Sequence, residues 1–331
     1  NVAQSITSLT RFTITAFDLG AGWIHGFPLL WNHPTIWGES WGRMLKAMNS
    51  KEWMYGYVAA NKSAINDAII RGHMVFESAE YMEGAGLITK IPGVGAVARK
   101  FEQAFTGYLD TARIELWKSL SKPNMTDDYA RAIGSHIDRL MGSAHYASLG
   151  ADKNFMALQS VILFAPRYYR SCLGLYKNIA TGDIRGYRAL QSVARMQANM
   201  HLSYYAMCQA MGQEAYLNPA DSRYLSFKVG NSYIGLGGFH RSLNRLLVDV
   251  GNDISKGNGS GLVETIAEFG RAKLSTLMRL PVDMLTGTNF LGESIFDEGV
   301  FMAVVNIGKG QLPIFLQAML DEAPGDKIGD R

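Results

Sequence analysis

Apolar residues recur at helical spacing along most of this chain, and this periodicity limits its fold more than any other feature. The clearest stripe repeats every three or four positions through Val97, Phe101, Phe105, Leu109, Ala112 and Leu116. Residues with that period lie on one face of an α-helix, and such a face must be buried against other elements. The sequence therefore predicts a mainly α fold, a multi-helix assembly.

Local start signals divide this pattern into separate helices. Pro34 suits the first turn of a helix, where its missing N–H costs nothing. Thr126 is the expected N-cap of a helix over Asp127–Leu140. Pro166 interrupts an apolar run and predicts an elbow between two helices. Further helices are predicted over residues 5–19, 51–72, 182–211 and 262–277, with a methionine stripe at Met196, Met200, Met207 and Met211.

The hydrophobic period changes to two at about residues 223–236, which predicts one small β-hairpin. Leu225, Phe227 and Val229 are expected on one face of its first strand. Glycines at the end of the second strand fit the turn into a helix that begins near Phe239. We interpret them as structural rather than as a phosphate-binding loop. The structural turn residues predicted here are Gly230, Asn231, Gly235, Gly237 and Gly238.

Breaks in the pattern divide the chain into three regions. We expect an N-terminal helical segment over 1–89, a helical region over 90–217, and the β-hairpin with a C-terminal helical region over 218–331. The string "SKGNGSG" from Ser255 predicts a flexible loop. Because the sequence does not begin with Met, we expect a fragment or module of a larger chain.

Composition excludes several classes of protein. Charged residues make up 18% of the 331 positions, below the roughly 25% of an average domain, so the surface suits a chain that packs against neighbours. The net charge of +3 is spread out, and no basic patch typical of nucleic-acid binding stands out. The two cysteines, Cys172 and Cys208, are too few and too far apart for a zinc ribbon or a disulfide scaffold.

Motifs that could carry catalysis or metal binding all have a simpler structural interpretation. Ser40 lies in "GESWG", which fits a nucleophile elbow, but an elbow follows a strand and the surrounding pattern is helical. His136 and His145 with Asp138 could bind a metal only if two elements converged. Glu77, Glu80 and Glu83 are typical of a solvated last helical turn. The sequence therefore predicts no catalytic, cofactor-binding or metal-binding residue, and no cofactor.

Arg241 and Arg245 are the candidate binding residues. They lie one helical turn apart, directly after the glycines that follow the hairpin, and could contact an anion or nucleic acid there. The alternative is structural: two arginines at this spacing can bridge to nearby carboxylates such as Asp249. Both interpretations stay open at the level of the sequence.

Four strings resemble, in the same order, segments of large polyvalent proteins from bacteriophages and mobile elements. They are "IPGVGAVARKFEQAFTGYLDTARIELW", "FAPRYYRS", "NPADSRYLSFKVGNSYIGLGGFHRSLNRLLVDV" and "KLSTLMRLPVDMLTGTNFLG". The chain resembles a polyvalent protein-associated domain over residues 87–320. It departs from the family at "NPADSRYLSF", where relatives more often have a Ser-Ser-Asp step and a basic strand. The family offers no catalytic residue to carry over.

The resemblance implies a non-enzymatic virion protein, either an internal core or ejection protein or a helical module of a packaged polyvalent protein. Its location would be the capsid interior and, after genome delivery, the host cell. Its partners would be portal or internal core proteins and further copies of itself as a homo-oligomer, with weak DNA contact and membrane contact on ejection as further hypotheses. The alternative is a non-catalytic accessory subdomain of a phage polymerase or nuclease that binds nucleic acid or nucleotide through the hairpin, Arg241 and Arg245.

Overall fold

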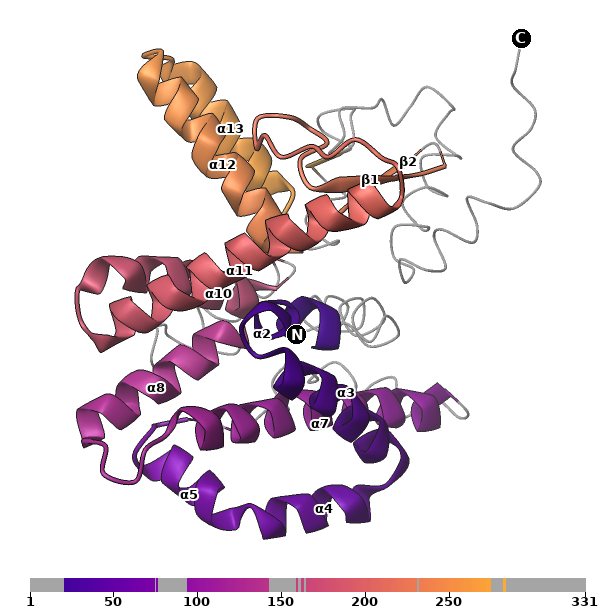
Figure 1. Ribbon diagram of the computed structural model, residues 1–331, viewed down its shortest axis with the longest axis vertical. Helices are drawn as coiled ribbons and strands as arrows, with labels where there is room; N and C mark the ends of the chain where they lie inside the picture. The colour runs from indigo at the N-terminus through magenta and orange to yellow at the C-terminus, as the bar shows by residue number, and fades with distance from the viewer. Residues whose placement is uncertain are drawn as a thin grey trace.

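The computed structural model describes residues 21–74, 76, 94–142, 159, 162–163, 165–230, 232–274 and 282–283. Within these ranges the fold is mainly helical with one two-stranded antiparallel sheet, which confirms the predicted fold class (Figure 1). The predicted helix at 5–19 and the glutamates at 77, 80 and 83 lie outside the described residues.

Residues 51–70 form one end of the long axis, whereas the first described residues lie near its middle (Figure 1). The expected helix start at Pro34 is confirmed, since Pro34 occupies the first turn of its helix. The helix predicted over 51–72 is wrong in one respect, because it is two helices that break at Asn61. There Asn61 has a φ of −106° and a ψ of 13°, outside the α-helical range, and its Nδ2 donates to the Tyr57 carbonyl at 2.9 Å. The elements are η1 (Ala21–His25), α2 (Phe27–Asn32), α3 (Pro34–Asn49), α4 (Lys51–Ala60) and α5 (Lys62–Ile70).

Two helices carry the first core. α7 (Val94–Leu120) packs lengthwise on α3, and a Cβ added at Gly107 would overlap the side chain of Ala47. α8 (Asp127–Leu140) begins as predicted, because the Thr126 Oγ1 accepts from the Tyr129 N–H at 3.3 Å. The predicted apolar stripe of α7 is buried from Phe105 onward.

This core crosses the region boundary expected between residues 89 and 90. Leu29, Met44 and Ala68 from one side pack in the same buried cluster as residues of α7 and α8 from the other side. Ala189 and Val193 join the cluster from a later helix. In the described residues, the first 89 positions thus share a core with the region that follows them.

Two further helices cross the middle of the molecule. α10 (Pro166–Asn178) begins at Pro166, where the second helix of the predicted elbow was expected, whereas most of the segment before Pro166 lies outside the described residues. η4 (Ile179–Thr181) connects α10 to α11 (Ile184–Ala210). Asp183 caps α11 by accepting from the N–H groups of Arg185 and Gly186.

The predicted methionine stripe of α11 is only half buried. Met196 and Met200 are buried, whereas Met207 and Met211 are each 48% exposed. The last turns of α11 pack a second core through Tyr204 and Cys208 and leave Met207 on the solvent side.

The hairpin consists of β1 (Ser226–Val229) and β2 (Ser232–Gly235), paired antiparallel with Val229 opposite Ser232. Gly230 opens its two-residue loop with a φ of 58°, and Asn231 lies outside the described residues. The predicted apolar face is wrong at one end. Leu225 lies before the strand with a φ of 50° but packs in the same buried cluster as Phe227, whereas Val229 is 55% exposed because no described element covers the hairpin tip.

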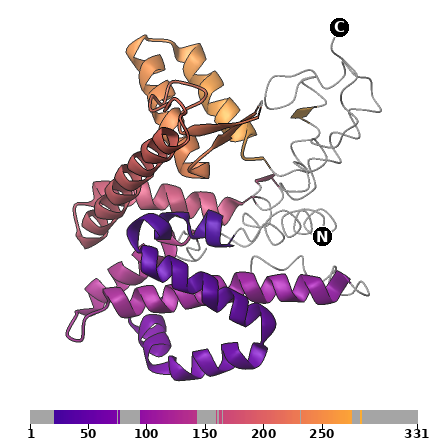
Figure 2. The same ribbon diagram turned by 45° about the vertical axis from the view of Figure 1, so that its right-hand side comes forward.

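A pair of antiparallel helices projects from the body at the opposite end from α4 and α5 (Figures 1 and 2). α12 (Gly238–Ser255) begins beside Phe239 as predicted, and its N-cap Gly237 has a φ of 109° that favours glycine. α13 (Gly259–Arg271) begins earlier than expected. Asn258 caps it by accepting from the Gly261 N–H at 3.0 Å, so the loop predicted over 255–261 is short and capped.

Candidate functional site

The predicted arginines lie at the joint between the hairpin and α12, but they have different surroundings. The guanidinium of Arg241 donates to the carbonyl oxygens of Tyr224 and Ser222, the latter at 2.8 Å, and to the Ser226 Oγ at 3.0 Å. Burial lowers the pKa of Arg241, and the positive charge of Arg245 lowers it further. Arg241 therefore fixes the chain that enters β1 against the first turns of α12.

Arg245 has fewer bonds. Its Nε is buried and has no hydrogen-bond partner in the described part of the chain, and no ion pair there joins it to Asp249. The bridge to Asp249 that its spacing allowed is therefore not formed. Instead Arg223, and at longer range Arg245, lower the pKa of Asp221 to about 2. The two predicted residues share one region, and of the two only Arg241 is held by hydrogen bonds to the described part of the chain.

The glycines after β2 give this joint its close packing. Gly235 lies next to the side chain of Arg241, and a Cβ there would come within 3.0 Å of the Arg241 guanidinium. A Cβ at Gly237 would approach the Met200 Sδ to 2.9 Å. Gly238 has a φ of 48° at the start of α12. These glycines thus bring the backbone against Arg241 and α11.

A chain of buried and half-buried polar side chains, which we call the polar seam, begins beneath this joint. The Tyr224 hydroxyl accepts from the Asn244 Nδ2 at 3.0 Å and lies 2.7 Å from the His201 Nε2. Asn244 and Gln197 exchange two hydrogen bonds, at 2.8 Å and 3.0 Å. The polar seam consists of Tyr224, His201, Asn244, Gln197, Tyr176, His240 and Cys172.

The far end of the polar seam places a thiol beside an imidazole. The Gln197 Nε2 donates to the Tyr176 hydroxyl at 3.1 Å, and this hydroxyl lies 3.3 Å from the His240 Nδ1. The other ring nitrogen of His240 is 4.0 Å from the Cys172 Sγ. A cysteine and a histidine in contact are the parts of a nucleophilic dyad.

The environment of this pair does not suit catalysis. Burial raises the pKa of the Cys172 thiol to about 12 and lowers the pKa of His240 to about 4. Both groups are therefore neutral at pH 7, whereas a nucleophilic cysteine needs a lowered pKa and access to substrate. Cys172 is 1% exposed and His240 is fully buried. The pair serves to join α10 to α12.

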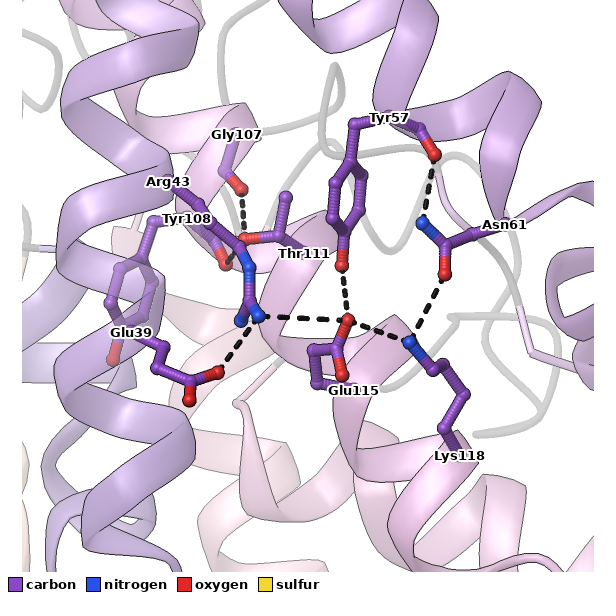
Figure 3. A network of polar contacts seen from close by, with 9 residues as sticks. All are labelled: Glu39, Arg43, Tyr57, Asn61, Gly107, Tyr108, Thr111, Glu115 and Lys118. Atoms are coloured by element: carbon purple, nitrogen blue, oxygen red, sulfur yellow. Dashed lines mark hydrogen bonds and ion pairs between the residues drawn. The ribbon is translucent and has the colours of Figure 1, made fainter.

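A second polar network lies at the other end of the molecule, between α3, α4 and α7 (Figure 3). The Glu115 carboxylate accepts from the Tyr57 hydroxyl at 2.6 Å and from the Lys118 Nζ at 3.0 Å, and the Arg43 Nη2 is 3.8 Å away. Burial raises the pKa of Glu115, but the bonds from Tyr57 and Lys118 and the charge of Arg43 lower it overall. The carboxylate is therefore ionised at pH 7 and holds α4 against α7.

The other residues with catalytic or metal-binding patterns are dispersed. Ser40 is fully buried within α3, so the strand that a nucleophile elbow requires does not precede it. The His136 Nε2 contacts the Ser192 Oγ at 3.2 Å, while Asp138 pairs with the buried Arg113. His145 lies outside the described residues. Over those that are described, no three His, Cys, Asp or Glu side chains gather to bind a metal.

Neither the polar seam nor the Glu115 network was predicted from the sequence. Each joins residues that are far apart in the chain: Tyr57 and Glu115 are separated by 58 positions, and Cys172 and His240 by 68. The only local signal was the departure from apolar periodicity at Gln197 and Asn244, each a polar residue on the inner side of its helix.

The chain was compared with family models, curated proteins and solved structures, and none of them matches it. In addition, none of the described helices has the length and the apolar content that crossing a membrane requires.

Proposed function

We propose that this chain is a non-enzymatic bacteriophage virion protein, an internal core or ejection protein or a helical module of a packaged polyvalent protein. The string that most specifically resembles that family, Tyr224 to Leu247, supports this role through its structure. It builds the joint in which Arg241 and the polar seam bond to the chain's own atoms. A joint in which Arg241 and the polar seam bond internally fits a scaffold better than a catalytic centre, although the Arg245 Nε in the same joint has no described partner.

Exposed apolar side chains on the projecting helices fit assembly in a particle. Leu247 and Ile254 on α12 are 56% and 65% exposed, and Val263 and Ile266 on α13 are 69% and 54% exposed. Large apolar groups gathered on a projecting element are typical of protein interaction surfaces. In the proposed role, neighbouring portal or core proteins cover this end of the molecule.

Purified particles provide the test. Mass spectrometry of mature virions should detect the chain, and cryo-electron microscopy should place it inside the capsid. A phage that carries Ile266→Glu should package fewer copies, while Glu264→Gln, an exposed and already polar position on the same helix, should package the normal number. Absence of the chain from mature virions would contradict the proposal.

One observation favours a second function, the accessory subdomain of a phage polymerase or nuclease. The Arg245 Nε is buried without a partner and lies near Arg241 and Arg223, so an anion at this surface would satisfy it. In this case Arg245→Gln should weaken binding of single-stranded DNA or nucleotide and reduce its salt dependence. Unchanged affinity in that variant would contradict the accessory-subdomain role and would not bear on the virion role.

A further inference from the structure

α11 carries apolar side chains on two opposite faces, although its outer side also exposes polar residues such as Arg195 and Asn199. Its inner face carries Met196, Met200 and Tyr204, which are fully buried. Its outer face carries a second stripe, with side chains 60%, 52%, 67% and 48% exposed at Tyr187, Leu190, Leu202 and Tyr205. A helix that packs on one side alone has a polar outer face. The outer stripe of α11 is therefore a candidate contact surface.

The outer stripe of α11 is symmetric about its centre. It consists of Tyr187, Leu190, Ala194, Ala198, Leu202 and Tyr205, all exposed. The two tyrosines lie nine residues before and after position 196. The two leucines lie six residues before and after it, and the two alanines lie two residues before and after it. Read in either direction, the stripe has the order tyrosine, leucine, alanine, alanine, leucine, tyrosine.

This symmetry identifies the partner. We infer that a second copy of the chain docks on this stripe, with the two α11 helices antiparallel across a two-fold axis at position 196. In a two-fold contact, residue i of one copy meets residue j of the other and j meets i. Tyr187 then meets Tyr205 of the second copy, Leu190 meets Leu202, and Ala194 meets Ala198.

The side-chain sizes fit this pairing. Alanines at the crossing point let the two helix axes approach at the short end of the usual 8–10 Å range. Leucines then pack beside them and tyrosines close the ends, over a stripe about 27 Å long. An interfacial membrane helix carries bulky apolar groups at the centre of its face, where this stripe has Ala194 and Ala198. One helix pair is a small interface, so the dimer is weak and concentration-dependent.

The inference deepens the proposed assembly role by naming one of its partners, and it rests on that role only for its biological use. Self-association of the purified chain requires no particle. A monomeric chain found inside virions would therefore contradict the dimer alone, and a dimeric chain absent from virions would contradict the virion role alone.

Sedimentation equilibrium over a range of concentrations measures the dimer. Ala194→Glu places a carboxylate at the crossing point twice in each dimer and should raise the dissociation constant at least about tenfold. The position is exposed, so folding should be preserved, which circular dichroism checks. Ala59→Glu makes the same change from alanine to glutamate at an exposed position of α4, outside both proposed surfaces, and should leave the dissociation constant unchanged.

A charge pair tests the antiparallel register. In the double variant Ala194→Glu/Ala198→Arg, each introduced carboxylate faces an introduced guanidinium of the second copy, so dimerisation should return to within a few-fold of the original dissociation constant. Parallel helices would bring like charges together, and the double variant would stay monomeric. That result would overturn the inference.

Three other results would also overturn it. They are a chain that is monomeric at every soluble concentration, a dimer that Ala194→Glu does not weaken, and a monomer that binds vesicles of anionic lipid through this face. The last result would assign the stripe to a membrane surface, with Arg185 and Arg195 as its flanking cations.

Discussion

At the scale of single residues, Arg241 is the side chain whose bonds most clearly hold two elements together. Arg241→Met removes the donors to Tyr224, Ser222 and Ser226 while keeping the apolar stem. A hydrogen bond from a charged group contributes at most about 1.5–3 kcal/mol to the free energy of unfolding. In this variant the oxygens that accept from Arg241 also lose their partner. We expect the free energy of unfolding to fall by about 2–4 kcal/mol, as measured by urea denaturation.

Arg245→Met is the matched control for this prediction. It makes the same substitution one turn later on α12, at a guanidinium whose Nε has no hydrogen-bond partner among the described residues. Its free energy of unfolding should change by less than about 0.5 kcal/mol. Equal losses in both variants would show that Arg241 contributes only charge or packing to this region, and not the bonds that we assign to it.

The sequence predicts residues whose role depends on their immediate neighbours. Thr126 and Pro34 act within one turn of helix, and Gly230 acts within one turn of chain, so their patterns are visible locally. The oxygens that Arg241 binds lie 15 to 19 positions earlier, across a hairpin. Nothing in the local pattern around Arg241 distinguishes a ligand-binding arginine from one that bonds to the protein.

At the scale of elements, one close contact between helices depends on the absence of a side chain. A Cβ on Gly134 of α8 would overlap the backbone carbonyl of Gly72, which follows α5. Backbone cannot move aside as the end of a flexible side chain can, so Gly134→Ala should lower the free energy of unfolding by about 1–3 kcal/mol. Thermal denaturation followed by circular dichroism measures this change.

Gly56→Ala should raise the free energy of unfolding, in contrast to Gly134→Ala. Gly56 lies inside α4 with no atom near the position of a Cβ, so alanine adds helix propensity without a clash. We expect an increase of about 0.5–1 kcal/mol in the free energy of unfolding. A gain in stability at both glycines would mean that α8 does not approach α5 as closely as in this structure.

The differences between predicted and observed elements have local causes that a hydrophobic pattern does not contain. The pattern over 51–72 continues through Asn61, and only the bond from its side chain to Tyr57 reveals the break. The string at 255–261 has the composition of a flexible loop, yet Asn258 starts α13 within it. Periodicity thus predicts which helices exist, while capping side chains determine where they end.

At the scale of the whole molecule, buried histidines hold the layers of helices together. His25 lies 3.0 Å from the Met141 carbonyl at the end of α8, His136 joins α8 to α11 through Ser192, and His240 joins α12 to α10 and the polar seam. Burial is the main cause that lowers the pKa of each to about 4. All three joints therefore contain a neutral imidazole at pH 7.

This arrangement predicts that protonation of these histidines loosens the fold between about pH 6.5 and pH 4. The unfolded chain binds protons at these histidines near pH 6.5, whereas the folded chain binds them only near pH 4. Their contribution to the free energy of unfolding is therefore fully present above about pH 6.5 and is lost as the pH falls from 6.5 to 4. At pH 5, each of the three should contribute a loss of about 2 kcal/mol relative to pH 7. Urea denaturation at the two pH values measures the total.

His136→Gln isolates one histidine. After burial, the positive charges of Arg188, His33 and Arg139 lower the pKa of His136, and a neutral amide at this position has no proton to gain. An amide can keep the contact with Ser192, so the variant should fold at pH 7 and lose about 2 kcal/mol less stability than the unsubstituted chain between pH 7 and pH 5. If both proteins lost the same amount over this interval, folding would not lower the pKa of His136, and the acid sensitivity of the molecule would have to arise at other joints.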